Sequence, residues 1–189
     1  MHVKGSVSRE KKTNFYKERD LEKRKAFLED LEKVPMENRV YIDESGINQY
    51  VYREYGRAPR GEKVLGEVSG KRFSRESFIA GLCEGKFVAP ICFEGTCTTD
   101  FFNVWLEKAL VPELSSGKVV ILDNASFHRS EESKRIVEKA GCQLLFLPAY
   151  SPDLNPIEKF WANLKVKIRE LLRSAQTLSD AIDGAFTTM

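Results

Sequence analysis

Histidine and cysteine are scarce in this chain, and their spacing excludes the usual kinds of protein zinc site. Two histidines, His2 and His128, accompany four cysteines, and no two of the cysteines form a Cys-x-x-Cys pair. A zinc site needs about four nitrogen or sulfur ligands at close spacing. We therefore expect the cysteines to be buried, reduced thiols. They are Cys83, Cys92, Cys97 and Cys142.

Long apolar runs are also missing. No stretch approaches the roughly 18 apolar residues that a membrane-spanning helix needs, and residues 1–20 lack the apolar core of a signal peptide. Hydrophobic residues make up 42% of the sequence and charged residues 31%, which is too apolar for a disordered chain and too charged for a membrane bundle. We expect a cytoplasmic protein of one ordinary domain, with no membrane partner.

Charge of one sign is not in excess, because 30 basic and 28 acidic residues give a net charge of +2. Basic residues nevertheless concentrate in residues 53–75 and 159–173, and a local positive field can bind phosphate. At the start of the first segment, tyrosines precede and alternate with the basic residues, which suits stacking on nucleic-acid bases. An ordinary solvated surface is the alternative for both segments. The candidate DNA-binding residues are Arg53, Arg57, Arg60, Lys159 and Lys165.

The succession of apolar patterns predicts an α/β fold. We expect strands over 39–45, 73–82, 86–93, 118–122 and 142–147, and helices over 17–33, 99–109, 130–140, 155–172 and 178–186. The short apolar runs at 118–122 and 142–147 favour strands that are buried on both faces. Antiparallel strands followed by β-α-β-α units give a mixed five-stranded sheet flanked by helices, which is the ribonuclease H-like order.

Residues 17–33 are highly charged and carry few apolar side chains. Leu21, Leu28 and Leu31 predict a surface helix with a thin apolar stripe. Pro35 ends this helix. We expect residues 1–38 to form a basic tail and a helix, residues 39–173 to form the ribonuclease H-like domain, and residues 174–189 to form a C-terminal helix.

Two acids stand at the ends of predicted strands. Asp43 shares one face of its strand with Tyr41, and Asp123 shares one face of its strand with Ile121. If the two strands are neighbours, both carboxylates reach the same point at the sheet edge where sites collect. An unpaired buried charge costs several kcal/mol or more, so a cation there would neutralise them. The alternatives are a turn-capping Asp43 and an Asx turn at Asp123.

A third acid, Glu158, begins the most apolar helix. The pattern Asn155-x-x-Glu158, with Pro156 at the first helical position, also fits a capping box. A helix N-terminus favours an acid electrostatically. From the pattern alone, Glu158 is either a cap or a ligand.

Three segments together resemble the catalytic blocks of mariner-superfamily DDE transposases, in particular the bacterial insertion-sequence branch. They are residues 41–45 (YIDES), 122–128 (LDNASFH) and 147–161 (LPAYSPDLNPIEKFW). The 34 residues between Asp123 and Glu158 match the spacing of that branch. The resemblance implies that Asp43, Asp123 and Glu158 are the catalytic acids.

The same resemblance places Asn124 and His128 near the site. A packing or helix-start histidine is the alternative for His128. Glu44 lies beside Asp43, but strand alternation puts its side chain on the opposite face, so we favour Asp43 as the catalytic acid.

Three carboxylates suit a hard cation, Mg²⁺ or Mn²⁺. Two such ions about 3.5–4 Å apart activate the attacking oxygen and stabilise the leaving one in phosphodiester displacement. The resemblance implies hydrolysis at transposon ends and strand transfer into target DNA, at a TA dinucleotide, by a dimer assembled on DNA. The cell would be of bacterial type, with nucleoid DNA as the partner.

Two other functions remain open at this stage. One is a ribonuclease H-like nuclease that cuts without strand transfer, and the other is an inactive or co-opted DNA-binding remnant. The 38 residues before the first strand are too few for a pair of helix-turn-helix modules, so the chain resembles a catalytic domain without its sequence-specific DNA reader.

Overall fold

The computed structural model describes residues 16–48, 59 and 75–189. The described residues form the predicted mixed five-stranded sheet, and its strand order is β3-β2-β1-β4-β5. β1 runs antiparallel to β2 and parallel to β4, and β4 runs parallel to β5. The strands are β1 (Arg39–Asn48), β2 (Arg75–Cys83), β3 (Lys86–Glu94), β4 (Val119–Leu122) and β5 (Gln143–Phe146).

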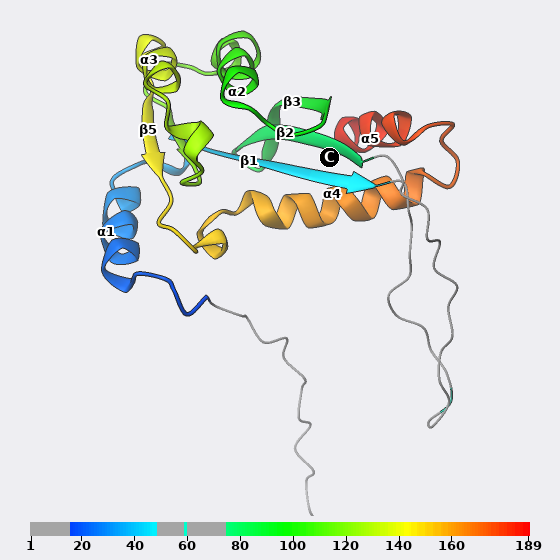
Figure 1. Ribbon diagram of the computed structural model, residues 1–189, viewed down its shortest axis with the longest axis horizontal. Helices are drawn as coiled ribbons and strands as arrows, with labels where there is room; N and C mark the ends of the chain where they lie inside the picture. The colour runs from blue at the N-terminus through cyan, green and yellow to red at the C-terminus, as the bar shows by residue number, and fades with distance from the viewer. Residues whose placement is uncertain (1–15, 49–58, 60–74) are drawn as a thin grey trace, which may run out of the picture.

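Helices cover both faces of this sheet (Figure 1). α2 and α3 lie on one face, and α4 lies on the other with α5 beside it. The helices are α1 (Leu21–Glu32), α2 (Thr99–Trp105), α3 (Glu131–Lys139), α4 (Ile157–Leu171) and α5 (Leu178–Thr187). Shorter helical turns are η1 (Met36–Asn38), η2 (Leu106–Leu110), η3 (Val111–Glu113), η4 (Ser126–Arg129) and η5 (Pro152–Leu154).

Alternation along β1 divides the protein into two cores. Val40 and Ile42 point into the cluster formed with α2 and α3, whereas Tyr41 packs on the side of α4 and α1. The same period of two applies in β4, where Val120 joins the first cluster and Ile121 the second side. Successive residues of one strand therefore serve opposite faces.

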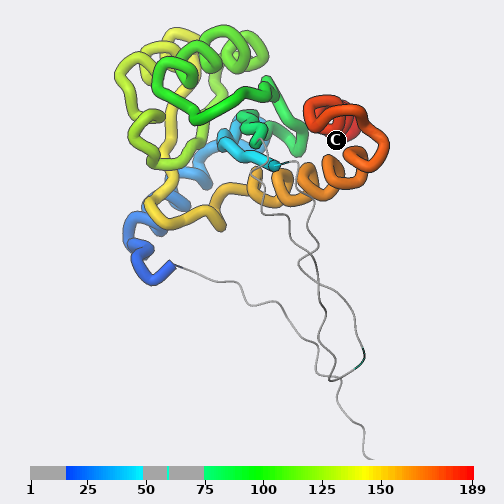
Figure 2. Tube along the Cα trace, turned by 45° about the vertical axis from the view of Figure 1, so that its right-hand side comes forward, coloured from blue at the N-terminus to red at the C-terminus, as the bar shows by residue number. Residues whose placement is uncertain are grey.

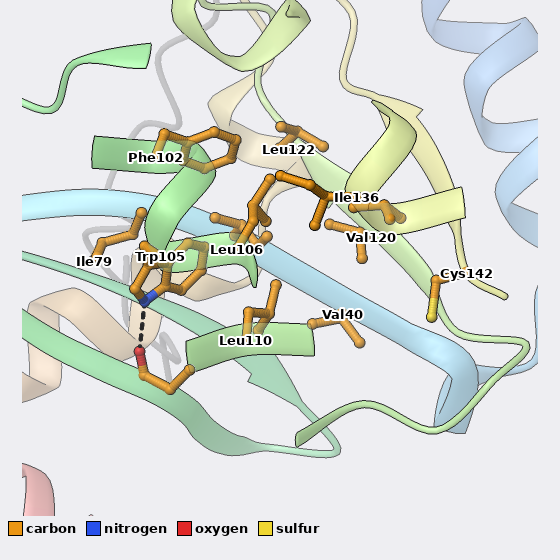
Figure 3. Packing of buried hydrophobic residues seen from close by; sticks show 13 residues of the cluster. Val40, Ile79, Phe102, Trp105, Leu106, Leu110, Val120, Leu122, Ile136 and Cys142 are labelled. Atoms are coloured by element: carbon orange, nitrogen blue, oxygen red, sulfur yellow. Dashed lines mark hydrogen bonds between the residues drawn. The ribbon is translucent and has the colours of Figure 1, made fainter. Parts of the chain in front are cut away.

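The helix that covers the core on the α2 side of the sheet changes type along its length. The predicted helix 99–109 is α-helical only to Trp105, and then continues as the π-helical turn η2. Both ends of this turn, Leu106 and Leu110, are fully buried (Figure 3). The Trp105 indole Nε1 donates to the Ala89 carbonyl at 2.9 Å, which ties the helix to β3. Gly81 in β2 allows the side chains of Val88 and Leu110 to lie close to the β2 backbone, since a Cβ there would be 2.7 Å from the Val88 side chain.

α1 packs against the sheet through different residues from those expected. Phe27 and Leu31, four residues apart, are buried against Val119, Ile121 and other apolar side chains. The predicted stripe was wrong at Leu21 and Leu28, which are 64% and 41% exposed. Packing against the sheet buries Phe27 and Leu31, the i, i+4 pair that contains the aromatic ring. Leu21 and Leu28 are left in solvent.

Two further expectations about burial were wrong. β5 is an edge strand, so its residues are half-buried or exposed rather than covered on both faces. All four cysteines are free thiols, but only Cys142 is buried, and Cys83, Cys92 and Cys97 are partly exposed. No helix in the described part is long and apolar enough to cross a bilayer.

The π-helical turn provides a test of the core. Leu106→Ala removes a fully buried side chain, and we expect it to lower the free energy of unfolding by about 2–5 kcal/mol. Val104→Ala, on the same segment but 59% exposed, should change it by less than about 0.5 kcal/mol. Urea unfolding followed by circular dichroism measures both. Equal losses in the two variants would contradict the packing described for η2.

Candidate active site

Asp43 and Asp123 lie at the same edge of the sheet. In the parallel β1–β4 pair, Tyr41 is in register with Ile121. Asp43 and Asp123 each follow two residues later, so the two acids extend on the same face from neighbouring strands. The two strands are thus neighbours, which was the condition for their carboxylates to reach the same point.

The Asp43 carboxylate sits in a partly buried position beneath α4. The Trp161 indole Nε1 donates to Asp43 Oδ2 at 3.0 Å. Burial, together with the negative charges of Glu158 and Glu44, raises the pKa of Asp43 to about 7, although the Trp161 hydrogen bond lowers it. A carboxyl with this pKa takes up a proton unless a positive charge is nearby.

The Asp123 carboxylate is held by η4 and the turn before it. The Ala125 amide donates to Asp123 Oδ1 at 3.0 Å, which is the Asx turn anticipated as one alternative. His128 Nδ1 lies 2.7 Å from the same oxygen. Burial raises the pKa of Asp123, but these two hydrogen bonds outweigh burial and the net shift is downward.

His128 links Asp123 to Glu44 across the sheet edge. Its ring is 1% exposed, and its Nε2 lies 2.9 Å from Glu44 Oε1. Burial lowers the pKa of His128, but the hydrogen bonds to Asp123 and Glu44 prevail and raise it to about 9. The doubly protonated ring therefore donates to both carboxylates. The ring also packs against Phe102 and Phe127, with centroids 4.4 and 4.2 Å away. His128 is therefore both a packing residue and a neighbour of the site acids.

Glu158 lies in the first turn of α4, with its side chain exposed. The capping-box alternative was wrong, because Pro156 is the N-cap and the Glu158 amide donates to the Asn155 backbone carbonyl. Asn155 is buried instead. Its Nδ2 donates to the Ile42 carbonyl at 3.3 Å, and its Oδ1 accepts from the Ile157 amide at 3.4 Å. Asn155 therefore attaches the start of α4 to β1, one residue before Asp43.

The three predicted acids and Asn124 line one cavity of about 460 Å³. The rest of its lining is Ala125, the segment between β5 and α4, and Tyr16 from before α1. No three His, Cys, Asp or Glu side chains among residues 16–48, 59 and 75–189 are gathered closely enough to hold a metal ion by themselves. The three carboxylates line one cavity, but their side chains are not close enough to one another to form a metal coordination shell.

The donor set of this cavity nevertheless fits a hard divalent cation. Its charged lining groups are the carboxylates of Asp43, Asp123 and Glu158, and carboxylate oxygens are the ligands of Mg²⁺ and Mn²⁺. Burial and then the negative charges of Glu158 and Glu44 raise the pKa of Asp43. A divalent cation between these oxygens would remove that repulsion.

The predicted DNA-binding residues have different outcomes. Arg53, Arg57 and Arg60 lie outside the described residues. Lys159 is exposed on α4, next to Glu158. Lys165 is half-buried two turns further on; burial lowers its pKa, while the charges of Glu158 and Asp43 act to raise it. Lys165 therefore lies within electrostatic reach of the acids.

Two residues of the site were given other meanings from the sequence. The helical spacing of Trp161 in α4 is that of a core residue, and its side chain is buried, but its indole also holds Asp43. Glu44 was set aside as facing away from Asp43; it does so, and from the opposite face it holds His128. Neither hydrogen bond has a signal in residue spacing, because the partners are 118 and 84 positions apart.

The family to which the chain belongs follows from its match to a family model. The model for DDE superfamily endonucleases matches residues 38–181. The chain is a DDE superfamily endonuclease. Among curated proteins, none matches this sequence. The match spans all five strands, the three acids and α4, but not α1.

Solved structures share the fold of this DDE endonuclease. The Mos1 mariner transposase paired-end complex with Mn has a TM-score of 0.68 at 17% identity, over 100% of this chain and 61% of that one. The Mos1 paired-end complex with the left transposon end gives 0.65 at 17% identity, over 99% and 65%. The catalytic domain of Mos1 gives 0.64 at 17% identity, over 93% and 85%. The chain thus spans less than two thirds of the full Mos1 chains, and the match confirms the predicted ribonuclease H-like architecture.

The opposite pKa shifts of the two strand acids predict opposite effects of neutralising them. The pKa of folded Asp43, about 7, exceeds the ordinary 3.8, so the unfolded chain ionises first and stability is lost as the pH rises from about 4 to about 7. Without divalent ions, Asp43→Asn should therefore be more stable than the parent by about 1–3 kcal/mol near pH 8.

Asp123→Asn provides the contrast. The folded pKa of Asp123 is lowered, so its ionised form contributes stability that is lost as the pH falls through that pKa. This variant should be less stable than the parent near pH 8. Urea unfolding in the presence of a chelator, from about pH 4 to about pH 8, measures both variants. A shift of the same sign for both would contradict the environments described here.

Proposed function

We propose that this chain is the catalytic domain of a DNA transposase, which hydrolyses phosphodiester bonds at transposon ends and transfers the strand into target DNA. The observation that carries the proposal is the placement of Asp43, Asp123 and Glu158 around one open cavity from three separate elements. Membership of the DDE endonuclease family supports the hydrolysis, and the fold shared with the Mos1 strand transfer complex supports the joining step.

We assign the chain to the bacterial insertion-sequence branch of the mariner superfamily, with a TA target. The support is the third motif, residues 147–161, and the 34-residue separation between Asp123 and Glu158. In the structure this motif forms one wall of the cavity and then the start of α4.

Asp43, Asp123 and Glu158 would hold two Mg²⁺ or Mn²⁺ ions. Mos1 complexes with Mg and with Mn support this choice of metal. When bound, such a pair activates the attacking oxygen and stabilises the leaving one in an in-line displacement. The residues of this chain orient the ligands: Trp161 fixes one oxygen of Asp43, and His128 with the Ala125 amide fixes one oxygen of Asp123.

One cavity can serve both steps. It is lined by carboxylates, polar side chains and apolar groups, and no serine or tyrosine nucleophile is required. Water attacks in the first step and leaves a 3′-hydroxyl, which then attacks a second duplex. DNA is the partner in both steps, and we propose that two copies act together, because two transposon ends must be processed in concert.

Plasmid cleavage tests the enzyme directly. We expect the purified protein to nick or linearise supercoiled plasmid with Mn²⁺, and a chelator to abolish the reaction. Asp123→Asn and Glu158→Gln should each lower the rate at least a hundredfold, since residues that merely orient metal ligands already contribute about 10–100-fold. Asp183→Asn, an exposed acid on α5, is the matched control and should cleave as the parent does.

The products separate the alternatives. Joining of a labelled oligonucleotide with a 3′-hydroxyl to the plasmid supports a transposase. Cleavage without joining would favour the nuclease that lacks strand transfer. DNA binding without cleavage at high protein concentration would favour the remnant, and cleavage that survives in Asp123→Asn would refute the assignment of the acids.

Lys165 gives a test of DNA contact that does not need catalysis. If Lys165 binds a phosphate, Lys165→Gln weakens DNA binding at low salt and reduces the slope of log K against log salt by about 1. Lys134→Gln, an exposed lysine on α3 across the sheet, should leave the slope unchanged. An unaltered slope in Lys165→Gln would mean that this lysine only offsets the charges of Glu158 and Asp43.

A further inference from the structure

α1 lies outside the residues that the family model matches, yet it contacts the segment that leads into α4. The guanidinium of Arg24 donates two parallel hydrogen bonds to the Asp153 carboxylate in η5, from Nη1 at 2.9 Å and Nη2 at 2.7 Å. Figure 2 shows α1, in blue, beside this gold segment. The two side chains are 13% and 29% exposed, in contrast to the 73% and 61% of the Lys25–Glu29 pair on the same helix.

This ion pair has the features of a strong one. Bidentate Arg–carboxylate pairs fix direction as well as distance, because two N–H groups meet two oxygens in one plane. Partial burial reduces the screening that makes exposed pairs weak. The hydrogen bond from Arg24 lowers the pKa of Asp153, so the carboxylate stays ionised at neutral pH.

Apolar packing adds to the same contact. Phe27 and Leu31 of α1 are buried in one cluster with Leu147, and Leu154 packs against that cluster. Leu147 and Leu154 bracket the segment that forms the cavity wall. In front of α1, the ring of Tyr16 lies 5.9 Å from that of Tyr150. α1, together with Tyr16 before it, thus contacts the segment at its beginning, its middle and its end.

α1 is itself attached to the sheet. The Arg39 guanidinium, at the first residue of β1, donates to the carbonyls of Leu31 and Val34 at the end of α1. Tyr150 has a φ of 56°, a left-handed backbone that a bulky residue keeps only when its surroundings hold it. Because α1 is attached both to β1 and to residues 147–154, it can hold the backbone of Tyr150 in this conformation.

The contact continues to Glu158 through the backbone. The Asn155 amide donates to the Pro152 carbonyl at 2.9 Å, and the Glu158 amide donates to the Asn155 carbonyl at 3.3 Å. Asp153 lies inside the first of these turns. A displacement of Asp153 would therefore move Asn155 and the first turn of α4, where Glu158 stands.

We propose that Arg24 and Asp153 are positioning residues of the active site. Through them α1 braces residues 147–158 and holds Glu158 opposite Asp43 and Asp123. The inference rests on the proposed function only in the role given to Glu158. Arg24 and Asp153 themselves touch neither DNA nor metal in this assignment.

The first test is hydrogen exchange of the protein without metal or DNA. Arg24→Gln and Asp153→Asn should each speed exchange in peptides that cover residues 147–158, by several-fold, and leave peptides of β2 and β3 unchanged. Arg135→Gln is the matched control, since Arg135 forms a bidentate pair with Glu132 within α3, away from the cavity. The charge swap Arg24→Glu with Asp153→Arg should restore protection at least in part.

The second test is the dependence on Mn²⁺. If the brace orients Glu158, the Mn²⁺ concentration for half-maximal plasmid cleavage should rise about tenfold in Arg24→Gln, as for other residues that orient metal ligands. Calorimetric titration with Mn²⁺ alone should show the same loss of affinity. The swap variant should recover, and Arg135→Gln should match the parent in both measurements.

Two results would overturn the inference. One is unchanged exchange over 147–158 in both Arg24→Gln and Asp153→Asn. The other is faster exchange there with an unchanged Mn²⁺ affinity, which would make the pair structural only. Failure of the parent protein to cleave any plasmid would count against the proposed function instead, because exchange and calorimetry judge the brace without DNA.

Discussion

Mutual repulsion among carboxylates is the constraint on which this structure depends. Three acids line one cavity, and each additional negative charge makes it harder for the others to stay ionised. The fold meets this by drawing the acids from three elements that the sheet already fixes. β1 brings Asp43, the end of β4 brings Asp123 and the start of α4 brings Glu158. Because the parallel register of β1 and β4 is set by buried apolar residues, the core determines where the charges meet.

The three acids are held in different ways, and the differences have consequences. Asp43 accepts one hydrogen bond from an indole and is otherwise buried, so its pKa rises. Asp123 accepts from a protonated imidazole and a backbone amide, so its pKa falls. At neutral pH the Asp123 carboxylate is therefore ionised and ready to bind a cation. The Asp43 carboxyl would become fully ionised only when a cation binds beside it. Pairs of acids with pKa values driven apart in this way are typical of catalytic sites.

Sequence patterns were sufficient for the five strands of the sheet, whereas the family resemblance was needed to select the three acids that line the cavity. Period-two alternation placed Asp43 and Glu44 on opposite faces, and apolar runs located β4 and β5. The patterns failed where tertiary contacts decide. The Asn155-x-x-Glu158 capping box is locally favourable, but Asn155 is used instead to reach the Ile42 carbonyl. The apolar stripe of α1 is ambiguous because its few leucines occupy two sides, and only the presence of the sheet selects Phe27. Three residues outside the described part, Arg53, Arg57 and Arg60, stay predictions.

Glu44 supports Asp123 from the opposite face of β1, through His128. Glu44 neighbours Asp43 in the chain and lies on the other face, where it accepts from His128, whose second nitrogen reaches Asp123. Without Glu44, the buried imidazole would have one acidic partner, and its charged form would be less favoured. The protonated ring supplies one positive charge beneath a cavity lined with three negative ones. The sequence Asp43-Glu44 at the middle of β1 therefore provides a cavity carboxylate on one face and, on the other, the carboxylate that keeps His128 protonated, so that Asp123 stays ionised.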